Sequence, residues 1–181
     1  MHFAIEISKQ NMALAEFIID TKRFSIETLK QLTQTPHTLK LDNAVVDIVS
    51  KNRAFLERKL AEPNARYYGI NTGFGALCDV KISNENIEQL QENLVMSHAC
   101  GMGDEVKPEV AKLMLLLKIK GLSLGSSGVC VETIQKLVEF YNADVIPLIW
   151  EVGSLGASGD LAPLAHMSLP LLGMGEVRYK G

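Results

Sequence analysis

Residues 153–172 read GSLGASGDLAPLAHMSLPLL. This stretch predicts a glycine-rich loop and then a helix over about residues 161–172, because Asp160 is a good N-cap and Pro163 still lies in the first turn. Pro170 is expected to kink or end that helix. The helix has almost no polar face, so it must be buried on all sides. Central docking in a small domain, partner chains or the remainder of a longer protein could bury it. We favour the third, because only nine residues follow.

Upstream of this helix, apolar residues recur mainly at helical spacing. Ser25 and Asp42 are candidate N-caps, and Pro108 suits the first turn of a further helix. The segment HTLKL at 37–41 alternates polar and apolar residues and is predicted to be a short strand. The predicted fold class is therefore mainly α with a few short strands. The predicted helices cover about residues 26–32, 45–61, 87–98, 110–124 and 131–141.

Two of these helices carry further expectations. The helix at 110–124 is apolar almost all round, which predicts deep burial. Gly101 and Gly103 are expected to end the helix at 87–98.

Composition excludes several classes of protein. The chain has 181 residues, 47% of them apolar and 22% charged, with a net charge of −3. No basic run rises above this background, so we expect no nucleic-acid surface. Lysines interrupt the most apolar stretch, and the N-terminus lacks a basic start followed by a long apolar core. We therefore expect neither a membrane span nor a signal peptide.

The three cysteines, Cys78, Cys100 and Cys130, form no CxxC pair. They are interpreted as buried reduced thiols in a cytoplasmic protein, and no metal site is expected.

The loop at about 153–160 admits several interpretations. It could simply turn the chain into the next helix. A nucleophile elbow needs the pattern GxSxG, which this loop does not have. The phosphate-binding patterns GxxxxGK[ST] and GxGxxG are both absent as well. A helix N-terminus could still hold an anion.

Cyclisation of Ala157, Ser158 and Gly159 fits this loop better. The amide nitrogen of Gly159 can attack the carbonyl carbon of Ala157, which closes a five-membered ring only for three consecutive residues. Loss of one water gives an imidazolone, and loss of the Ser158 hydroxyl as a second water leaves an exocyclic methylidene. Glycine suits the third position because it has no Cβ to obstruct the attack. The product is a strong electrophile made without an external cofactor.

Three segments carry a resemblance to a known family. GSLGASGDLAPLAH at 153–166 resembles the signature of the histidine and aromatic amino acid ammonia-lyases. YGINTGFG at 68–75 and LQENLVMSHACGMG at 90–103 resemble two further markers of that family, in the same order and at about the same separations. Motif matches become specific when their expected context accompanies them. The resemblance covers roughly residues 25–181 and is closest to the histidine ammonia-lyases.

The resemblance implies a mainly helical homotetramer and an enzyme that eliminates ammonia from an α-amino acid. The members of the family are about three times as long as this chain. Residues 1–181 would thus be a single N-terminal portion of an ammonia-lyase-like helical fold, and we expect this portion alone to be inactive. A methylidene-imidazolone would capture the substrate, and a tyrosine would remove its β proton.

The site residues follow from the matching positions. Ala157, Ser158 and Gly159 match the cyclising tripeptide. Tyr68, in an inner loop at about 66–82, matches the catalytic tyrosine. His98 matches a position that selects the substrate ring, and a histidine there resembles the histidine lyases and some tyrosine-acting members.

Other residues of these segments stay outside the assigned site. Asn71 and Phe74 could line the pocket or shape the turn, and His166 is interpreted as structural. The family usually has an arginine and an asparagine where this chain has Lys118 and Lys120, which puts the subgroup in doubt.

The expected reaction is therefore conversion of histidine to urocanate by a cytoplasmic ammonia-lyase. A tyrosine or phenylalanine ammonia-lyase and an aminomutase stay open as alternatives, because the same electrophile and tyrosine serve all three. A non-catalytic truncated lyase module is the alternative from a different class.

Overall fold

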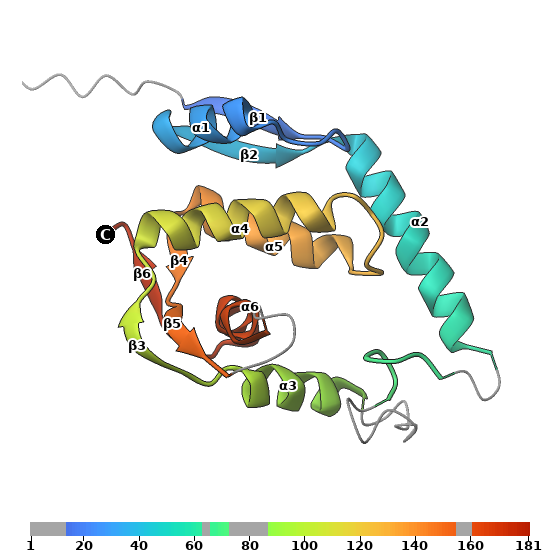
Figure 1. Cartoon of the computed structure of the whole chain (residues 1–181). Coiled ribbons are helices and arrows are strands. Elements are labelled where there is room, and N and C mark those ends of the chain that lie inside the picture. The colour runs from blue at the N-terminus through green and yellow to red at the C-terminus, as the bar shows by residue number, and fades with distance from the viewer. Residues whose placement is uncertain (1–13, 63–65, 73–86, 155–160) are drawn as a thin grey trace, which may run out of the picture.

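The computed structural model describes residues 14–62, 66–72, 87–154 and 161–181. Six α-helices and six short strands lie within these ranges (Figure 1). The mainly helical architecture predicted from the sequence is confirmed for this part of the chain.

The first layer is a βαβ unit made of β1 (Ala15–Ile19), α1 (Ile26–Gln34) and β2 (His37–Leu41). The two strands are parallel, with Ala15 opposite His37 and Ile19 opposite Leu41. Ser25 caps α1 as predicted, because its side chain accepts a hydrogen bond of 3.1 Å from the Thr28 amide.

The free edge of β2 is bonded to a side chain of another helix. The Leu39 amide donates to Asn142 Oδ1 at 2.7 Å, and Asn142 Nδ2 donates to the Leu39 carbonyl at 2.9 Å. Asn142 thereby satisfies both backbone groups of Leu39.

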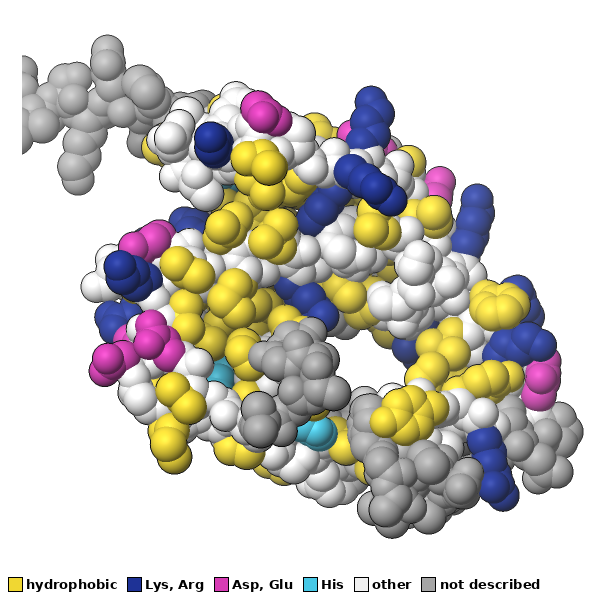
Figure 2. All heavy atoms as spheres, viewed as in Figure 1, with side chains coloured by type: hydrophobic (Ala, Val, Ile, Leu, Met, Phe, Trp, Pro, Cys, Tyr) yellow, Lys and Arg dark blue, Asp and Glu magenta, His cyan; other side chains and the backbone are white. Residues whose placement is uncertain are grey.

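Helix α2 (Asn43–Leu60) begins where the sequence predicts, with Asp42 accepting a hydrogen bond from the Ala44 amide at 2.8 Å. Only Val45 and Val49, in its first half, are buried. The second half runs away from the βαβ unit, and the space-filling view shows an opening between it and the rest of the molecule (Figure 2).

The core forms around α4 (Pro108–Leu122) and α5 (Val131–Asn142). Helix α4 buries Leu115, Leu116 and Ile119 completely or nearly so. The deep burial predicted for the whole of α4 is wrong on one side, because Val110 and Leu117 are each 44% exposed. Hydrophobic side chains accordingly gather on the face of the molecule shown in Figure 2.

Two antiparallel ribbons join the core to the remaining helices. Strand β3 (Gly101–Glu105) pairs with β5 (Trp150–Gly153), and β4 (Val145–Pro147) pairs with β6 (Val177–Tyr179). Helix α3 (Ile87–His98) ends at His98, before the glycines expected to end it. Gly101 and Gly103 lie in β3 instead: Gly101 pairs with Gly153, and Gly103 lies where the register shifts between Met102 and Glu105.

Helix α6 (Leu161–Ser168) lies between the core and α3 (Figure 1). It continues as one 3-10 turn (Leu169–Leu172), so the regular helix ends just before Pro170 as expected. Ala162, Ala165, His166 and Met167 are buried, whereas Leu161 is 47% exposed, so the burial predicted for all sides is incomplete in the described chain.

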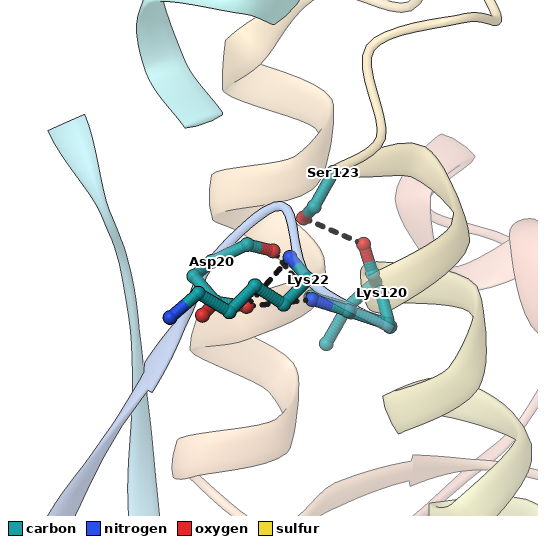
Figure 3. Close-up of polar contacts among 5 residues, drawn as sticks. Asp20, Lys22, Lys120 and Ser123 are labelled. Carbon is teal, nitrogen blue, oxygen red and sulfur yellow. Dashed lines mark hydrogen bonds and ion pairs between the residues drawn. The ribbon is translucent and has the colours of Figure 1, made fainter. Parts of the chain in front are cut away.

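A buried lysine connects α4 to the βαβ unit. Lys120 is only 6% exposed, and its ammonium donates to the carbonyl of Asp20 and, at 3.1 Å, to its carboxylate (Figure 3). The Phe24 ring lies 4.6 Å from the same nitrogen. The departure from the family pattern at this position thus has a local explanation, since Lys120 fixes the turn between β1 and α1.

We expect Lys120→Ala to lower the free energy of unfolding by about 1–2 kcal/mol, because it removes hydrogen bonds to Asp20 from a partly buried position. Partial burial pushes the pKa of Asp20 up, but the Lys120 and Lys22 hydrogen bonds and charges hold it below its ordinary 3.8. A lowered carboxyl pKa stabilises the fold above about pH 4, and that contribution is lost as the pH falls through the lowered value. Urea unfolding of Lys120→Ala and of Lys118→Ala as a control, at pH 7 and pH 3, measures both effects. An equal loss in the two variants at pH 7 contradicts the role of Lys120.

Candidate active site

The proposed electrophile segment lies between two described elements. Strand β5 ends at Gly153 and α6 begins at Leu161. Ala157, Ser158 and Gly159, together with the predicted cap Asp160, lie outside the described residues. The structure therefore places Gly153 and Ser154 before this gap and Leu161 after it, but not the residues between them.

His98 is the last residue of α3 and is half-buried. Its Nδ1 lies 2.6 Å from the Leu94 carbonyl oxygen. Since a carbonyl only accepts, Nδ1 donates, and the neutral ring then has an acceptor at Nε2. The backbone of its own helix thus sets the tautomer of His98.

The structure brings the segment that follows His98 to the strand end that enters the loop at 153–160. Three residues after His98, Gly101 pairs with Gly153 in the β3–β5 ribbon. Helix α3 also packs against α6, whose first residue follows the loop. Segments more than fifty residues apart in the sequence therefore meet at this point of the fold.

Tyr68 lies in a short turn that is attached to α3. The amide of Tyr67 donates to Asn71 Oδ1 at 2.8 Å, and the amide of Ile70 donates to the Tyr67 carbonyl at 3.1 Å. Gln91 of α3 donates to the Ile70 carbonyl at 3.2 Å. The Tyr68 residue itself is 64% exposed.

The turn that contains Tyr68 is bonded to α3, and His98 is the last residue of the same helix. Gln91 and His98 are seven residues apart, which is about two turns or 10 Å along one face of α3. The rest of the predicted inner loop, including Phe74, lies outside the described residues. Of the two roles considered for Asn71, shaping the turn is the one that its bond to Tyr67 shows.

A cavity of about 650 Å³ lies elsewhere, among Leu32, His37, Leu113, Tyr141 and Asp144. Neither Tyr68 nor His98 lines it, so this cavity and the candidate site are different places. Burial, followed by the charge of Asp144, raises the pKa of Tyr141 to about 12, so that phenol stays protonated at neutral pH.

The cysteines need one correction. Cys100 is exposed and Cys130 is half-buried, both as free thiols, so the predicted burial is wrong for Cys100, which follows α3 at the surface. Cys78 lies outside the described residues. Within the described ranges, no three His, Cys, Asp or Glu residues are grouped as metal ligands. None of the helices there is both long enough and apolar enough to cross a membrane.

Sequence reasoning assigned Gly101 to a helix end and Gly153 to a loop, and it missed that the two glycines meet. Gly101 and Gly153 pair with each other and lie directly under α6. The sequences GMG at 101–103 and EVG at 151–153 resemble ordinary turns. Only the long-range pairing of β3 with β5 shows that the two glycines are neighbours.

The mainly helical fold and the segment GSLGASGDLAPLAH at 153–166 agree with one class of lyase. A sequence model described as aromatic amino acid lyase matches residues 24–181, and the chain belongs to this family. It is 42% identical over 168 residues to the histidine ammonia-lyase of Vibrio cholerae serotype O1, covering 93% of this chain and 33% of that protein. It is 46% identical over 159 residues to the histidine ammonia-lyase of Pseudomonas fluorescens (strain SBW25), covering 88% and 31%.

Solved structures show the same fold. The histidine ammonia-lyase of Trypanosoma cruzi matches with a TM-score of 0.78 and 33% identity over 91% of this chain and 31% of that chain. A tyrosine aminomutase from Streptomyces globisporus matches with a TM-score of 0.83 and 29% identity over 92% and 31%. The chain thus spans about a third of the length of the curated relatives it matches.

Proposed function

We propose that these residues are the N-terminal part of an ammonia-lyase that converts histidine to urocanate. The observation that carries this is the pairing of Gly101, three residues after His98, with Gly153 at the start of the loop at 153–160, in a chain 42–46% identical to histidine ammonia-lyases. An imidazole substrate offers an N–H donor and a ring nitrogen acceptor. The His98 ring, whose Nδ1 is committed to Leu94, suits such a partner better than a hydrocarbon ring.

The residues of the loop fit a self-made electrophile. Ser158 supplies the hydroxyl that leaves, Gly159 supplies an unobstructed amide nitrogen, and both stand just before the first turn of α6. A methylidene-imidazolone formed there from Ala157, Ser158 and Gly159 would supply the electrophilic carbon that makes the substrate amine a better leaving group. No external cofactor is part of this proposal.

Tyr68 is proposed to act as the base. Its phenolate oxygen takes the β proton of the substrate, the electrons of that C–H bond form the carbon–carbon double bond, and the amine leaves as ammonia. An ordinary tyrosine pKa is about 10, so the complete site must favour the phenolate for this step to run at neutral pH.

Substitution of His98 tests the choice of substrate. We expect His98→Phe to shift the ratio of kcat/KM for histidine over phenylalanine by about 100-fold or more towards phenylalanine, because a polar contact to the ring is lost. Turnover of both amino acids by the complete protein, with Met96→Leu on the same helix as a control, measures this ratio. A ratio that does not change shows that His98 only packs.

An aminomutase is the second candidate, since a tyrosine aminomutase shares the fold at a TM-score of 0.83. The two activities differ in product: a lyase releases a conjugated acrylate and ammonia, whereas an aminomutase releases a β-amino acid. Chromatography of the products from histidine, tyrosine and phenylalanine separates them.

We also propose that residues 1–181 alone have no lyase activity. Preorganised groups aimed at the reacting atoms usually supply most of catalysis, and a third of a lyase chain contains only some of them. The experiment is to purify the 181-residue chain, determine its intact mass and incubate it with the three amino acids. Acrylate product from a chain lighter by two waters would show that the site is complete within these residues and refute this proposal.

A further inference from the structure

The two paired glycines lie where α6 touches the β3–β5 ribbon. A Cβ added to Gly101 would lie 2.4 Å from His166 Cε1 and 2.7 Å from Trp150 Cβ. A Cβ added to Gly153 would lie 2.5 Å from Ala162 Cβ. Neither glycine has a positive φ, so space and not backbone conformation requires glycine at these two positions.

The spacing of the two surfaces matches. Ala162 and His166 are four residues apart and share one face of α6, about 6 Å apart along its axis. Gly101 and Gly153 are direct partners across the ribbon, with Cα atoms about 5 Å apart. The side chain of His166 therefore lies against Gly101, and the side chain of Ala162 lies against Gly153.

His166 is the polar member of this contact. It is 4% exposed, and among the described residues no hydrogen bond of normal geometry reaches either ring nitrogen. Burial lowers the pKa of His166, and the nearby Ala99 backbone opposes that shift, so the ring is neutral at neutral pH. A buried imidazole to which the described residues offer no hydrogen bond of normal geometry is a poor choice for stability alone.

We propose that Gly101, Gly153, Ala162 and His166 form a seat that sets the position of His98 relative to Gly153 and Leu161, the described residues that flank the electrophile loop. His166 is a positioning residue in this arrangement: its ring lies against Gly101 and beside Ala99, the residue that follows His98. Ala162 stands three residues after Gly159 and lies against the strand end that enters the same loop. The inference rests on the proposed function, because it concerns the geometry of that site.

A displacement of the residues that form this seat would move the groups of the proposed active site. A methyl group on Gly101 must move its neighbours from 2.4 Å to an ordinary contact distance, a shift of more than about 1 Å. Misplacement of about 1 Å between catalytic groups can reduce turnover about 100-fold. The shift acts within a few residues of both His98 and Ala157-Ser158-Gly159.

The test compares Gly101→Ala, Gly153→Ala and the double variant Gly101→Ala/His166→Ala in the complete protein. Gly121→Ala is the matched control, because a Cβ there meets nothing within 4 Å. Three quantities are measured: the fraction of chains lighter by two waters, kcat per cyclised chain, and KM for histidine. Thermal unfolding of each variant, and of His166→Ala alone, completes the set.

We expect Gly101→Ala to lower kcat/KM per cyclised chain about 100-fold, with a raised KM, and Gly121→Ala to behave as wild type. Removing the ring in the double variant should restore part of the loss but not all of it, because the added Cβ still lies 2.7 Å from Trp150 Cβ. A defect that is only structural would reduce the amount of folded protein and leave KM and kcat per cyclised chain unchanged, and that result overturns the proposal. If Gly101→Ala does not fold, the same comparison is made with Gly153→Ala.

Failure of the proposed function gives a different result. In that case wild type itself forms no acrylate and shows no loss of two waters. The seat is then judged by unfolding temperatures: a Gly101→Ala loss that becomes smaller in the His166→Ala background supports the contact, and additive losses reject it.

Discussion

Replacing Ser158 with alanine is expected to abolish turnover by the complete protein while leaving its fold intact. The serine hydroxyl is the group that leaves as the second water, and without it no exocyclic methylidene can form. The substrate amine then has no electrophile to capture it. We expect kcat to fall by at least about 1,000-fold, a loss of about 4 kcal/mol of transition-state stabilisation.

Intact mass and circular dichroism accompany the kinetic measurement for this variant. The mass of Ser158→Ala should correspond to its sequence, or to the loss of one water if the ring closes without the methylidene. Ser154→Ala is the matched control, because Ser154 is an exposed serine four residues earlier. Near-normal turnover by Ser158→Ala would end the cyclisation hypothesis, whatever the control does.

Replacing Tyr68 with phenylalanine is expected to lower kcat by about 100- to 10,000-fold, the usual contribution of a positioned general base. The loss should be chemical, because Tyr68 is 64% exposed and its ring supports little of the described core. The electrophile should still form, so the chain should remain lighter by two waters. This combination separates Tyr68→Phe from Ser158→Ala.

The neighbouring tyrosine provides the control for this substitution. Tyr67 contributes its backbone amide and carbonyl to the turn, and Tyr67→Phe leaves both in place. Its turnover should stay within a few-fold of wild type. A Tyr68→Phe protein as active as Tyr67→Phe would remove Tyr68 from the mechanism.

Helix boundaries were predictable because local residues set them. Ser25 and Asp42 each accept the amide hydrogen bond that an N-cap makes, and Pro108 occupies the first turn of α4. The regular part of α6 ends before Pro170 for an equally local reason. The strand at 37–41 was also predictable, since its sequence alternates polar and apolar residues around Leu39, which is buried.

The ribbons were not predictable in the same way. GMGDE, which forms β3, contains residues that strands usually lack, and it becomes a strand only by pairing with Trp150–Gly153 almost fifty residues later. The exposed side of α4 is likewise invisible in its composition, because burial depends on what lies beside it. The roles of Tyr68, His98 and Ala157-Ser158-Gly159 remain predictions that the experiments above test.

The bond between Asn142 and β2 has a consequence for the behaviour of the protein in solution. A two-stranded parallel sheet leaves open edges to which a strand of another molecule can add, and such addition starts aggregation. The amide of Asn142 occupies both backbone groups of Leu39 at the centre of one edge, so an incoming strand cannot continue its hydrogen bonds there. One side chain at the end of α5 thereby protects the β1–β2 unit from forming intermolecular sheet along that edge.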